Sequence, residues 1–329
     1  MTKVGVIGAG AWGTALACAA KRGDNDVLLQ AHEPDVAEII NRSHVNPTYL
    51  PNINLDPNIR ATTNLIDVVD SDVVLLVAPA QYVRETCKQL KAIWHDGTPI
   101  LVCAKGIELD SGQIMSEVLE EELPGVMIGI LSGPTFATEV ANGLPSACTL
   151  AMHDMDKAME IGKIIGSDRF RIYASDDVIG AQIGGAVKNV LAIASGMASG
   201  KGFGDNARAA LITRGISELV RLAVVKGAKP ETLMGLSGMG DLTLTCNSMQ
   251  SRNFSLGFAL GQGQQLNDIL NSRKAVIEGV FTARSVCKLA ARLKVEMPIC
   301  TAVNQVLNEG ADINTVVDDL LSRPFKEEI

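Results

Sequence analysis

The stretch VGVIGAGAWGTALA, from Val4 to Ala17, decides the fold of the first half of the chain. An apolar run leads into three glycines, Gly8, Gly10 and Gly13, which are spaced G-x-G-x-x-G and followed by an alanine-rich segment. In a strand, turn and helix of this kind, the glycines permit a tight turn, let backbone approach a pyrophosphate and pack helix on strand. The stretch therefore predicts a dinucleotide-binding turn, although a tight turn without a ligand remains an alternative.

Six further apolar runs follow before residue 175 and are separated by turns or amphipathic segments. The runs are almost entirely apolar instead of alternating, as is typical of strands that are buried on both faces. They predict a mostly parallel sheet with helices on both faces, an α/β fold of the Rossmann type. The six runs are residues 26–31, 72–78, 99–105, 126–131, 146–151 and 170–174.

The second half of the chain shows a helical pattern, for example from Asn206 to Gly227. We therefore predict two domains, a dinucleotide-binding domain over residues 1–175 and an all-helical substrate and catalytic domain over residues 176–329. The long apolar stretch from Val178 to Ala198 contains Lys188, which would be costly in a bilayer. A core helix is therefore expected there, and no membrane insertion.

The composition excludes several classes of partner. The 329 residues carry a formal net charge of -8, which argues against a surface that binds nucleic acid or anionic membranes. The 7 cysteines are scattered, and the N-terminus shows no targeting leader, so we expect a reducing, cytoplasmic location. The 4 histidines lack the spacing of metal ligands, and no metal is predicted.

The end of the second predicted strand bears on the choice of cofactor. An Asp or Glu that binds an unmodified ribose often stands there, whereas this chain has Gln30, Ala31, His32 and Glu33. His32 is expected near the adenosine ribose or its 2′-phosphate, and Glu33 is expected at the start of the next helix. We predict that NADPH is at least accepted and that NADH is possible.

Lys188 is unusual because it is a lone cation in the apolar stretch IGGAVKNVLAIA. Burial lowers the pKa of a lysine and suits it to proton transfer near neutral pH. A lysine that reaches water from the edge of a helix is the alternative. We expect Gly184 and Gly185, one turn earlier, to leave space for a ligand beside the helix.

Three other charged residues are candidates for a substrate site. Lys105 follows an apolar strand, at the edge of a parallel sheet where ligands bind. Asp241 stands among small and apolar residues, where its carboxylate would orient Lys188. Arg252, at the start of a predicted helix, would bind a phosphate. Each residue also has an alternative without a functional role. Lys105 would then be a surface lysine, Asp241 would cap a helix, and Arg252 would form a surface ion pair.

These segments, taken in order, resemble the bacterial NAD(P)-dependent sn-glycerol-3-phosphate dehydrogenases. The resemblance covers nearly the whole chain and includes GAGAWGTALA, CAKGIE, LSGPTFATEVANGLPSA, GLSGMGDLTLTC, SRNFSLG and VIEGVFTA. It implies reversible hydride transfer between NAD(P)H and dihydroxyacetone phosphate, which gives sn-glycerol 3-phosphate for phospholipid synthesis. It also implies a homodimer.

The resemblance further assigns roles to individual residues, with Lys188 as the proton donor and acceptor. Members of the family often have a serine at the position of Ala11, and many have an arginine near that of His32. The implied substrate-binding residues are Lys105, Gly133, Thr135, Lys188, Asn189, Asp241, Thr245, Ser251, Arg252 and Asn253. The implied cofactor-binding residues are Gly8, Gly10, Ala11, Trp12, Gly13, His32, Lys105, Ala137, Arg252, Val276 and Glu278, the last expected near the adenine-side ribose.

Two other functions remain open from the residues alone. A hydroxyacid dehydrogenase of similar build could use Arg252 to bind a carboxylate. A binding protein that senses NADPH without catalysis would need the glycine turn, but it would not need Lys188 or Asp241.

Overall fold

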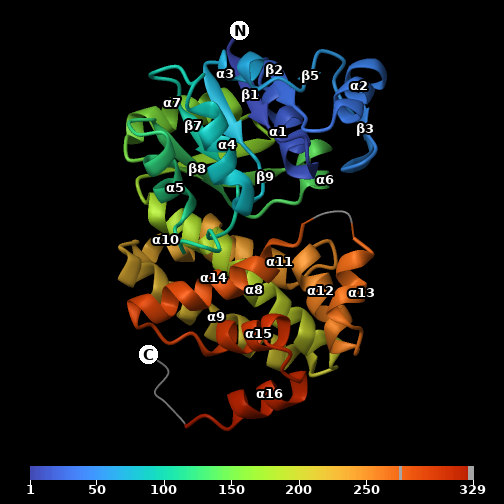
Figure 1. Cartoon of the computed structure of the whole chain (residues 1–329), viewed down its shortest axis with the longest axis vertical. Helices are drawn as coiled ribbons and strands as arrows, with labels where there is room; N and C mark the ends of the chain where they lie inside the picture. Colours follow the sequence, from blue (N-terminus) through green and yellow to red (C-terminus); the bar gives the residue numbers. More distant parts are fainter. Residues whose placement is uncertain (274–275, 325–329) are drawn as a thin grey trace.

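The computed structural model describes residues 1–273 and 276–324, and its two halves are distinct (Figure 1). The first half is built on one eight-stranded sheet in the order β10-β9-β8-β7-β6-β1-β2-β5. Neighbouring strands are parallel except for β8 and β9, so the predicted mostly parallel sheet is confirmed. The strands are β1 (Lys3–Ile7), β2 (Asp26–Gln30), β5 (Arg60–Thr62), β6 (Val73–Leu76), β7 (Ile100–Val102), β8 (Ile128–Ser132), β9 (Ser146–Ala151) and β10 (Phe170–Ser175).

All seven strands predicted from apolar runs are present, together with three strands that were not predicted. β5 has three residues, none of them fully buried, at the edge of the sheet. β3 (Val45–Asn46) and β4 (Leu50–Asn54) form a separate antiparallel pair. The helices of this half are α1 (Ala11–Arg22), α2 (Pro34–Ser43), α3 (Leu65–Val69), the 3-10 turn Ala80–Tyr82, α4 (Val83–Leu90), α5 (Met115–Glu122), α6 (Ala137–Ala141) and α7 (Met155–Ile165).

The second half is helical over the described residues, which confirms the predicted all-helical region. It lies below the sheet in Figure 1, where its helices run from yellow-green to red. Its helices are α8 (Val178–Gly200), α9 (Gly204–Lys226), α10 (Pro230–Met234), a π-helical turn (Leu236–Gly240), α11 (Asp241–Cys246), α12 (Arg252–Gly261), α13 (Leu266–Asn271), α14 (Glu278–Leu293), α15 (Pro298–Asn308) and α16 (Ile313–Leu321).

Helix α8 is the centre of the helical half. It packs against α9, α11, α12, α14 and α15. In its most apolar stretch of 18 residues, 94% is buried inside the protein. The predicted core helix is therefore confirmed. Glycines bring α12 into backbone contact with α8, since a Cβ atom on Gly257 would lie 2.0 Å from the carbonyl oxygen of Ile193.

Candidate active site

The glycine turn between β1 and α1 has the geometry of an anion site. Gly8 has a φ of +105°, and a Cβ atom on Gly13 would lie only 1.8 Å from the carbonyl oxygen of Gly8. Gly10 is the N-cap of α1 and offers no side-chain cap, and a Cβ atom there would meet nothing within 4 Å. The start of α1 is therefore open for a pyrophosphate, and these residues fit NAD(P)H.

His32 is the exposed side chain just beyond β2, while Ala11 and Trp12 lie half-buried in the first turn of α1. Glu33 is the N-cap of α2, as expected, and its carboxylate accepts a hydrogen bond of 2.6 Å from the hydroxyl of Tyr49. That bond raises the pKa of Tyr49 to about 12. Tyr49 thus occupies one oxygen of Glu33, while the side chain of His32 is exposed.

A buried carboxylate joins two lysines at the junction of the sheet and the helices. Asp241, which is fully buried, has Oδ1 at 2.5 Å from Lys188 Nζ and Oδ2 at 2.7 Å from Lys105 Nζ. Lys188 also donates to the hydroxyl of Thr245 at 2.8 Å. Residues 53 positions apart along the chain thus share one site.

The proton affinity of Lys188 is altered by this setting. The pKa of Lys188 is lowered to about 8, above all by burial. The negative charge of Asp241 opposes this shift, and the positive charge of Lys105 adds to it. Only 6% of Lys188 is exposed, so this lysine does not reach water from a helix edge. An ammonium group with this pKa can release and regain a proton near neutral pH.

The turn after β8 holds the other side of Lys105. Lys105 Nζ donates to the carbonyl oxygen of Gly133 at 2.9 Å, and Thr135 donates to the same oxygen at 3.3 Å. Ala137, half-buried, begins α6 just beyond. The ammonium group of Lys105 is therefore fixed by a carboxylate and a carbonyl, and its side chain keeps 16% exposure.

A chain of amides ties three helices to the end of β7. Asn189 donates to the carbonyl oxygen of Lys105 at 3.1 Å and accepts from Asn253 at 2.8 Å. Asn253 in turn accepts from the backbone N–H of Gly279 at 3.1 Å. Asn253, one of the substrate-binding residues that the resemblance implies, thus has both its amide nitrogen and its amide oxygen bonded within the protein.

The start of α12 carries the proposed anion anchor. Ser251 is its N-cap and accepts a hydrogen bond of 3.2 Å from the backbone of Phe254. Arg252 is exposed and donates to the carbonyl oxygen of Val276 at 2.8 Å, which leaves other N–H groups for an anion. Arg273, which the sequence analysis missed, donates to the carbonyl oxygen of Arg252 at 3.1 Å and adds a second cation here. No pattern in its segment singles it out.

Glu278, at the start of α14, reaches the turn that follows β6. Its Oε1 accepts from the backbone of Ala80 at 3.1 Å, and its buried Oε2 has no hydrogen-bond partner among the described residues. Ala80 follows β6, which lies on the opposite side of β1 from β2. The start of α14 thus meets Ala80 and Gly106, in the segments that follow β6 and β7, and the local sequence does not show this contact. Burial raises the pKa of Glu278.

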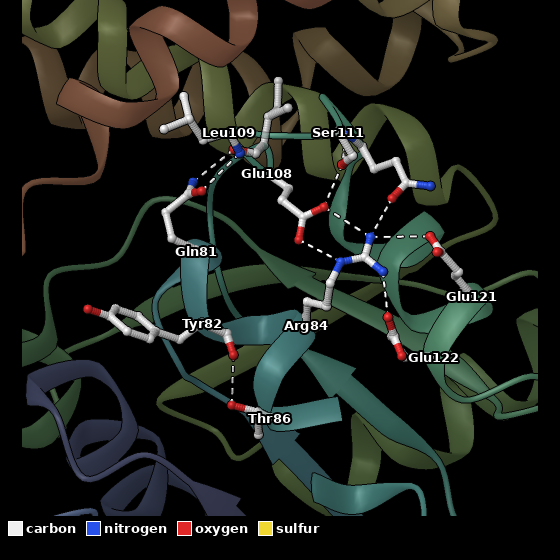
Figure 2. A network of polar contacts seen from close by, with 11 residues as sticks. Gln81, Tyr82, Arg84, Thr86, Glu108, Leu109, Ser111, Glu121 and Glu122 are labelled. Atoms are coloured by element: carbon white, nitrogen blue, oxygen red, sulfur yellow. Dashed lines mark hydrogen bonds and ion pairs between the residues drawn. The ribbon is translucent and has the colours of Figure 1, made fainter. Parts of the chain in front are cut away.

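The loop after Lys105 is clamped by α4 and the turn before it. Gln81 donates to the carbonyl oxygen of Ile107 and accepts from the N–H of Leu109, each at 2.9 Å. Figure 2 shows Arg84 reaching the carboxylate of Glu108 in this loop and also Glu121 and Glu122 of α5. These contacts fix the position of the loop that follows Lys105.

The space expected beside Gly184 and Gly185 is filled by the protein. A Cβ atom on Gly184 would lie 2.4 Å from the carbonyl oxygen of Ser237, and one on Gly185 would lie 2.8 Å from the hydroxyl of Ser132. The prediction that these glycines leave room for a ligand is therefore wrong. They let other segments of the chain approach α8 closely.

Comparisons with known proteins agree along the whole chain. A family model described as the NAD-dependent glycerol-3-phosphate dehydrogenase N-terminus matches residues 3–158, and its C-terminal counterpart matches residues 177–318. The glycerol-3-phosphate dehydrogenase (NAD(P)+) of Rhodospirillum rubrum is 52% identical over 99% of this chain and 93% of its own. The enzyme of that name from Maricaulis maris is 51% identical over 98% and 97%, respectively.

The fold agrees with a crystal structure of such an enzyme. Glycerol-3-phosphate dehydrogenase from Coxiella burnetii superposes with a TM-score of 0.94 at 38% identity, over 98% of this chain and 99% of that one. Both halves, their order and their packing are thus shared. The chain belongs to the NAD-dependent glycerol-3-phosphate dehydrogenase family.

Proposed function

We propose that the chain catalyses the reversible reduction of dihydroxyacetone phosphate to sn-glycerol 3-phosphate with NAD(P)H, and that Lys188 is its proton donor and acceptor. The single observation that carries the role of Lys188 is its 2.5 Å contact with the buried carboxylate of Asp241, next to Lys105. The family and its full-length relatives support the reaction.

Bound NAD(P)H supplies the hydride that is added to C2 of the ketone. Lys188 donates a proton to the forming alkoxide, so that the ketone gains one hydride and one proton and becomes an alcohol. The amine left on Lys188 regains its proton from solvent. Lys105 stabilises the negative oxygen in the transition state, an electrostatic effect that is worth several kcal/mol in a site without water. Asp241 holds both ammonium groups in place.

Arg252 anchors the phosphate of the substrate at the start of α12, with Ser251 and Asn253 beside it. Its exposed guanidinium group retains N–H donors after its bond to Val276. Binding energy at the phosphate, away from the reacting carbon, orients the ketone and lowers the barrier. Unphosphorylated dihydroxyacetone is therefore a very poor substrate.

Other residues complete the two binding sites in this proposal. Asn189 and Thr245 position the lysines and contact the substrate together with Gly133 and Thr135. Residues 1–175 form the cofactor domain and residues 176–329 the substrate and catalytic domain. The proposed cofactor contacts are Gly8, Gly10, Ala11, Trp12, Gly13, His32, Lys105, Ala137, Arg252, Val276 and Glu278.

NADPH is accepted in this proposal, and the exposed His32 beyond β2 leaves NADH possible. The enzyme acts as a cytoplasmic homodimer and delivers its product to phospholipid synthesis. These finer statements rest on analogy with the family.

The test follows the absorbance of NADPH, and separately NADH, with dihydroxyacetone phosphate, and runs wild type beside Lys188→Ala. We expect rapid oxidation by wild type and almost none by the variant. Dihydroxyacetone and simple 2-oxoacids serve as control substrates. Turnover of 2-oxoacids instead of dihydroxyacetone phosphate would point to a hydroxyacid dehydrogenase. Full activity of Lys188→Ala would refute the role of the lysine.

A further inference from the structure

Gly184 and Gly185 on α8 lie one turn before Lys188 and face two different parts of the charged cluster. A Cβ atom on Gly184 would lie 2.4 Å from the carbonyl oxygen of Ser237 and 3.0 Å from its carbonyl carbon. This contact joins two backbones, so neither side can give way by rotating a side chain. Ser237 belongs to the π-helical turn that leads directly into Asp241.

Gly185 faces the other lysine. A Cβ atom there would lie 3.3 Å from Cγ and 3.5 Å from Cδ of Lys105, and 2.8 Å from the hydroxyl of Ser132. The methylene groups of Lys105 therefore pass along α8 in the room that the missing side chain leaves. The ammonium group of Lys105 reaches Asp241 by this path.

We propose that Gly184 and Gly185 are positioning residues, which set the distances among Lys188, Asp241 and Lys105 by admitting the π-helical turn and the Lys105 side chain against α8. The inference rests on the proposed function of this cluster. π-Helical turns are rare and concentrate at functional sites, where an extra residue redirects the chain. A displacement of about 1 Å in such a site can cost about a hundredfold in rate.

The same helix provides a matched control. Gly200, at the far end of α8, makes a contact of the same kind, since a Cβ atom there would lie 2.3 Å from the carbonyl oxygen of Phe258. Gly200→Ala therefore disturbs the packing of α8 on α12, in the same way that Gly184→Ala disturbs the packing of α8 on the π-helical turn. It does so away from the three charged side chains.

The experiment compares Gly184→Ala, Gly185→Ala and Gly200→Ala with wild type. Circular dichroism and urea unfolding establish the folded fraction, and kcat and KM for dihydroxyacetone phosphate are measured across pH. We expect kcat to fall about a hundredfold in the first two variants, with little change in KM. In Gly184→Ala the pH limb of Lys188 moves to lower pH, because Asp241 withdraws. Gly200→Ala loses stability but keeps the kcat and pH profile of wild type.

Two outcomes overturn the inference. In the first, Gly184→Ala and Gly185→Ala fold and keep the kcat and pH profile of wild type. In the second, Gly200→Ala loses as much kcat as they do. If Gly184→Ala does not fold, Gly185→Ala decides, because the flexible side chains of Lys105 and Ser132 can move aside.

Failure of the proposed function is distinguishable from failure of the inference. A wild type without turnover on dihydroxyacetone phosphate contradicts the function alone. The pH dependence of urea unfolding still reports the ionisation of Lys188 in that case. An unchanged pH dependence in folded Gly184→Ala and Gly185→Ala then refutes the positioning role, and a shifted one supports it.

Discussion

Asp241 shares its two carboxylate oxygens between Lys188 and Lys105, at 2.5 Å and 2.7 Å, with no exposed surface of its own. One negative charge thus faces two ammonium groups. Lys188 relieves this imbalance by its lowered pKa. The carboxylate is therefore the part of the cluster on which both lysines depend.

Asp241→Asn is expected to destabilise the protein more than Lys188→Met. The amide keeps the shape of the carboxylate but leaves two ammonium groups without their counter-charge, a loss of about 3 kcal/mol in the free energy of unfolding. Lys188→Met leaves Asp241 paired with Lys105. Urea unfolding at neutral pH measures the difference. Glu160→Gln, which breaks an exposed ion pair with Lys157, is the control, and an equal loss there would contradict the argument.

The pH dependence of the rate should reverse with the direction of the reaction. Reduction of the ketone requires protonated Lys188, so kcat falls as the pH rises through about 8. Oxidation of glycerol 3-phosphate requires the neutral amine, so its rate rises over the same range. Steady-state rates in both directions across pH test this, and parallel profiles would exclude Lys188 as the shared group.

Stability should change with pH for the same reason. The pKa of Lys188 is about 8 in the folded chain, against a usual 10.5. The unfolded chain therefore binds more protons between these values, and the free energy of unfolding gains a contribution that rises with pH through that window. Below about pH 8 the protonated lysine is a constant cost. Urea titrations of wild type and Lys188→Met across this range should diverge in slope.

Two substitutions in the glycine turn should distinguish its role in cofactor binding from its role in stability. Gly10→Ala fits the backbone, with a φ of -66° and nothing within 4 Å of the new Cβ atom, so stability is retained while NADPH affinity falls. Gly13→Ala places a Cβ atom 1.8 Å from a backbone oxygen, so stability and affinity both fall. Thermal unfolding and NADPH fluorescence titration measure the two. Unimpaired NADPH affinity in Gly10→Ala would show that the pyrophosphate lies elsewhere.

His32→Asp should shift the preference toward NADH. A carboxylate beyond β2 repels a 2′-phosphate and accepts a hydrogen bond from an unmodified ribose. We expect the ratio of kcat/KM for NADH to that for NADPH to rise about tenfold, which corresponds to about 1.4 kcal/mol. The exposed His153→Asp, in the other half of the sheet, should leave the ratio unchanged. If the ratio stays constant in His32→Asp as well, the adenosine ribose is not at this position.

Arg84→Met should loosen the loop that follows Lys105. Its loss leaves the carboxylates of Glu108, Glu121 and Glu122 facing each other, at a cost of about 2 kcal/mol in the free energy of unfolding. The rate of backbone hydrogen exchange in residues 106–113 should increase in Arg84→Met. Arg42→Met removes an exposed pair with Glu38 and should change neither quantity. Protection of the loop as in wild type would mean that Gln81, with Lys288 and Arg292 of α14, is enough to hold it.

The sequence predicts the parts of the fold whose chemistry is local. Each of the seven predicted sheet strands lies in an apolar run, and Lys188 is visible because its neighbours are apolar. β5 was missed because Arg60–Thr62 is short, half-exposed and at an edge, where no apolar pattern is required. The helix start at Arg252 was predicted, and in the structure Ser251 is its N-cap residue.

Relations between distant segments escaped the sequence. The second contact of Asp241, with Lys105, the position of Glu278 beside Ala80 and the proximity of Arg273 to Arg252 depend on how helices dock. Gly184 and Gly185 show the limit most clearly. The sequence reveals missing side chains, but only the packed structure shows whether a ligand or the chain itself takes their place.

The buried position of α8 has a consequence for synthesis. Val178–Gly200 is apolar enough to cross a membrane, and it emerges from the ribosome about fifty residues before its main partner, α12. At about 5–20 residues per second, the face of α8 that packs on α12 stays uncovered for several seconds. The nascent chain therefore presents a target for chaperones and membrane-targeting factors that the finished protein conceals.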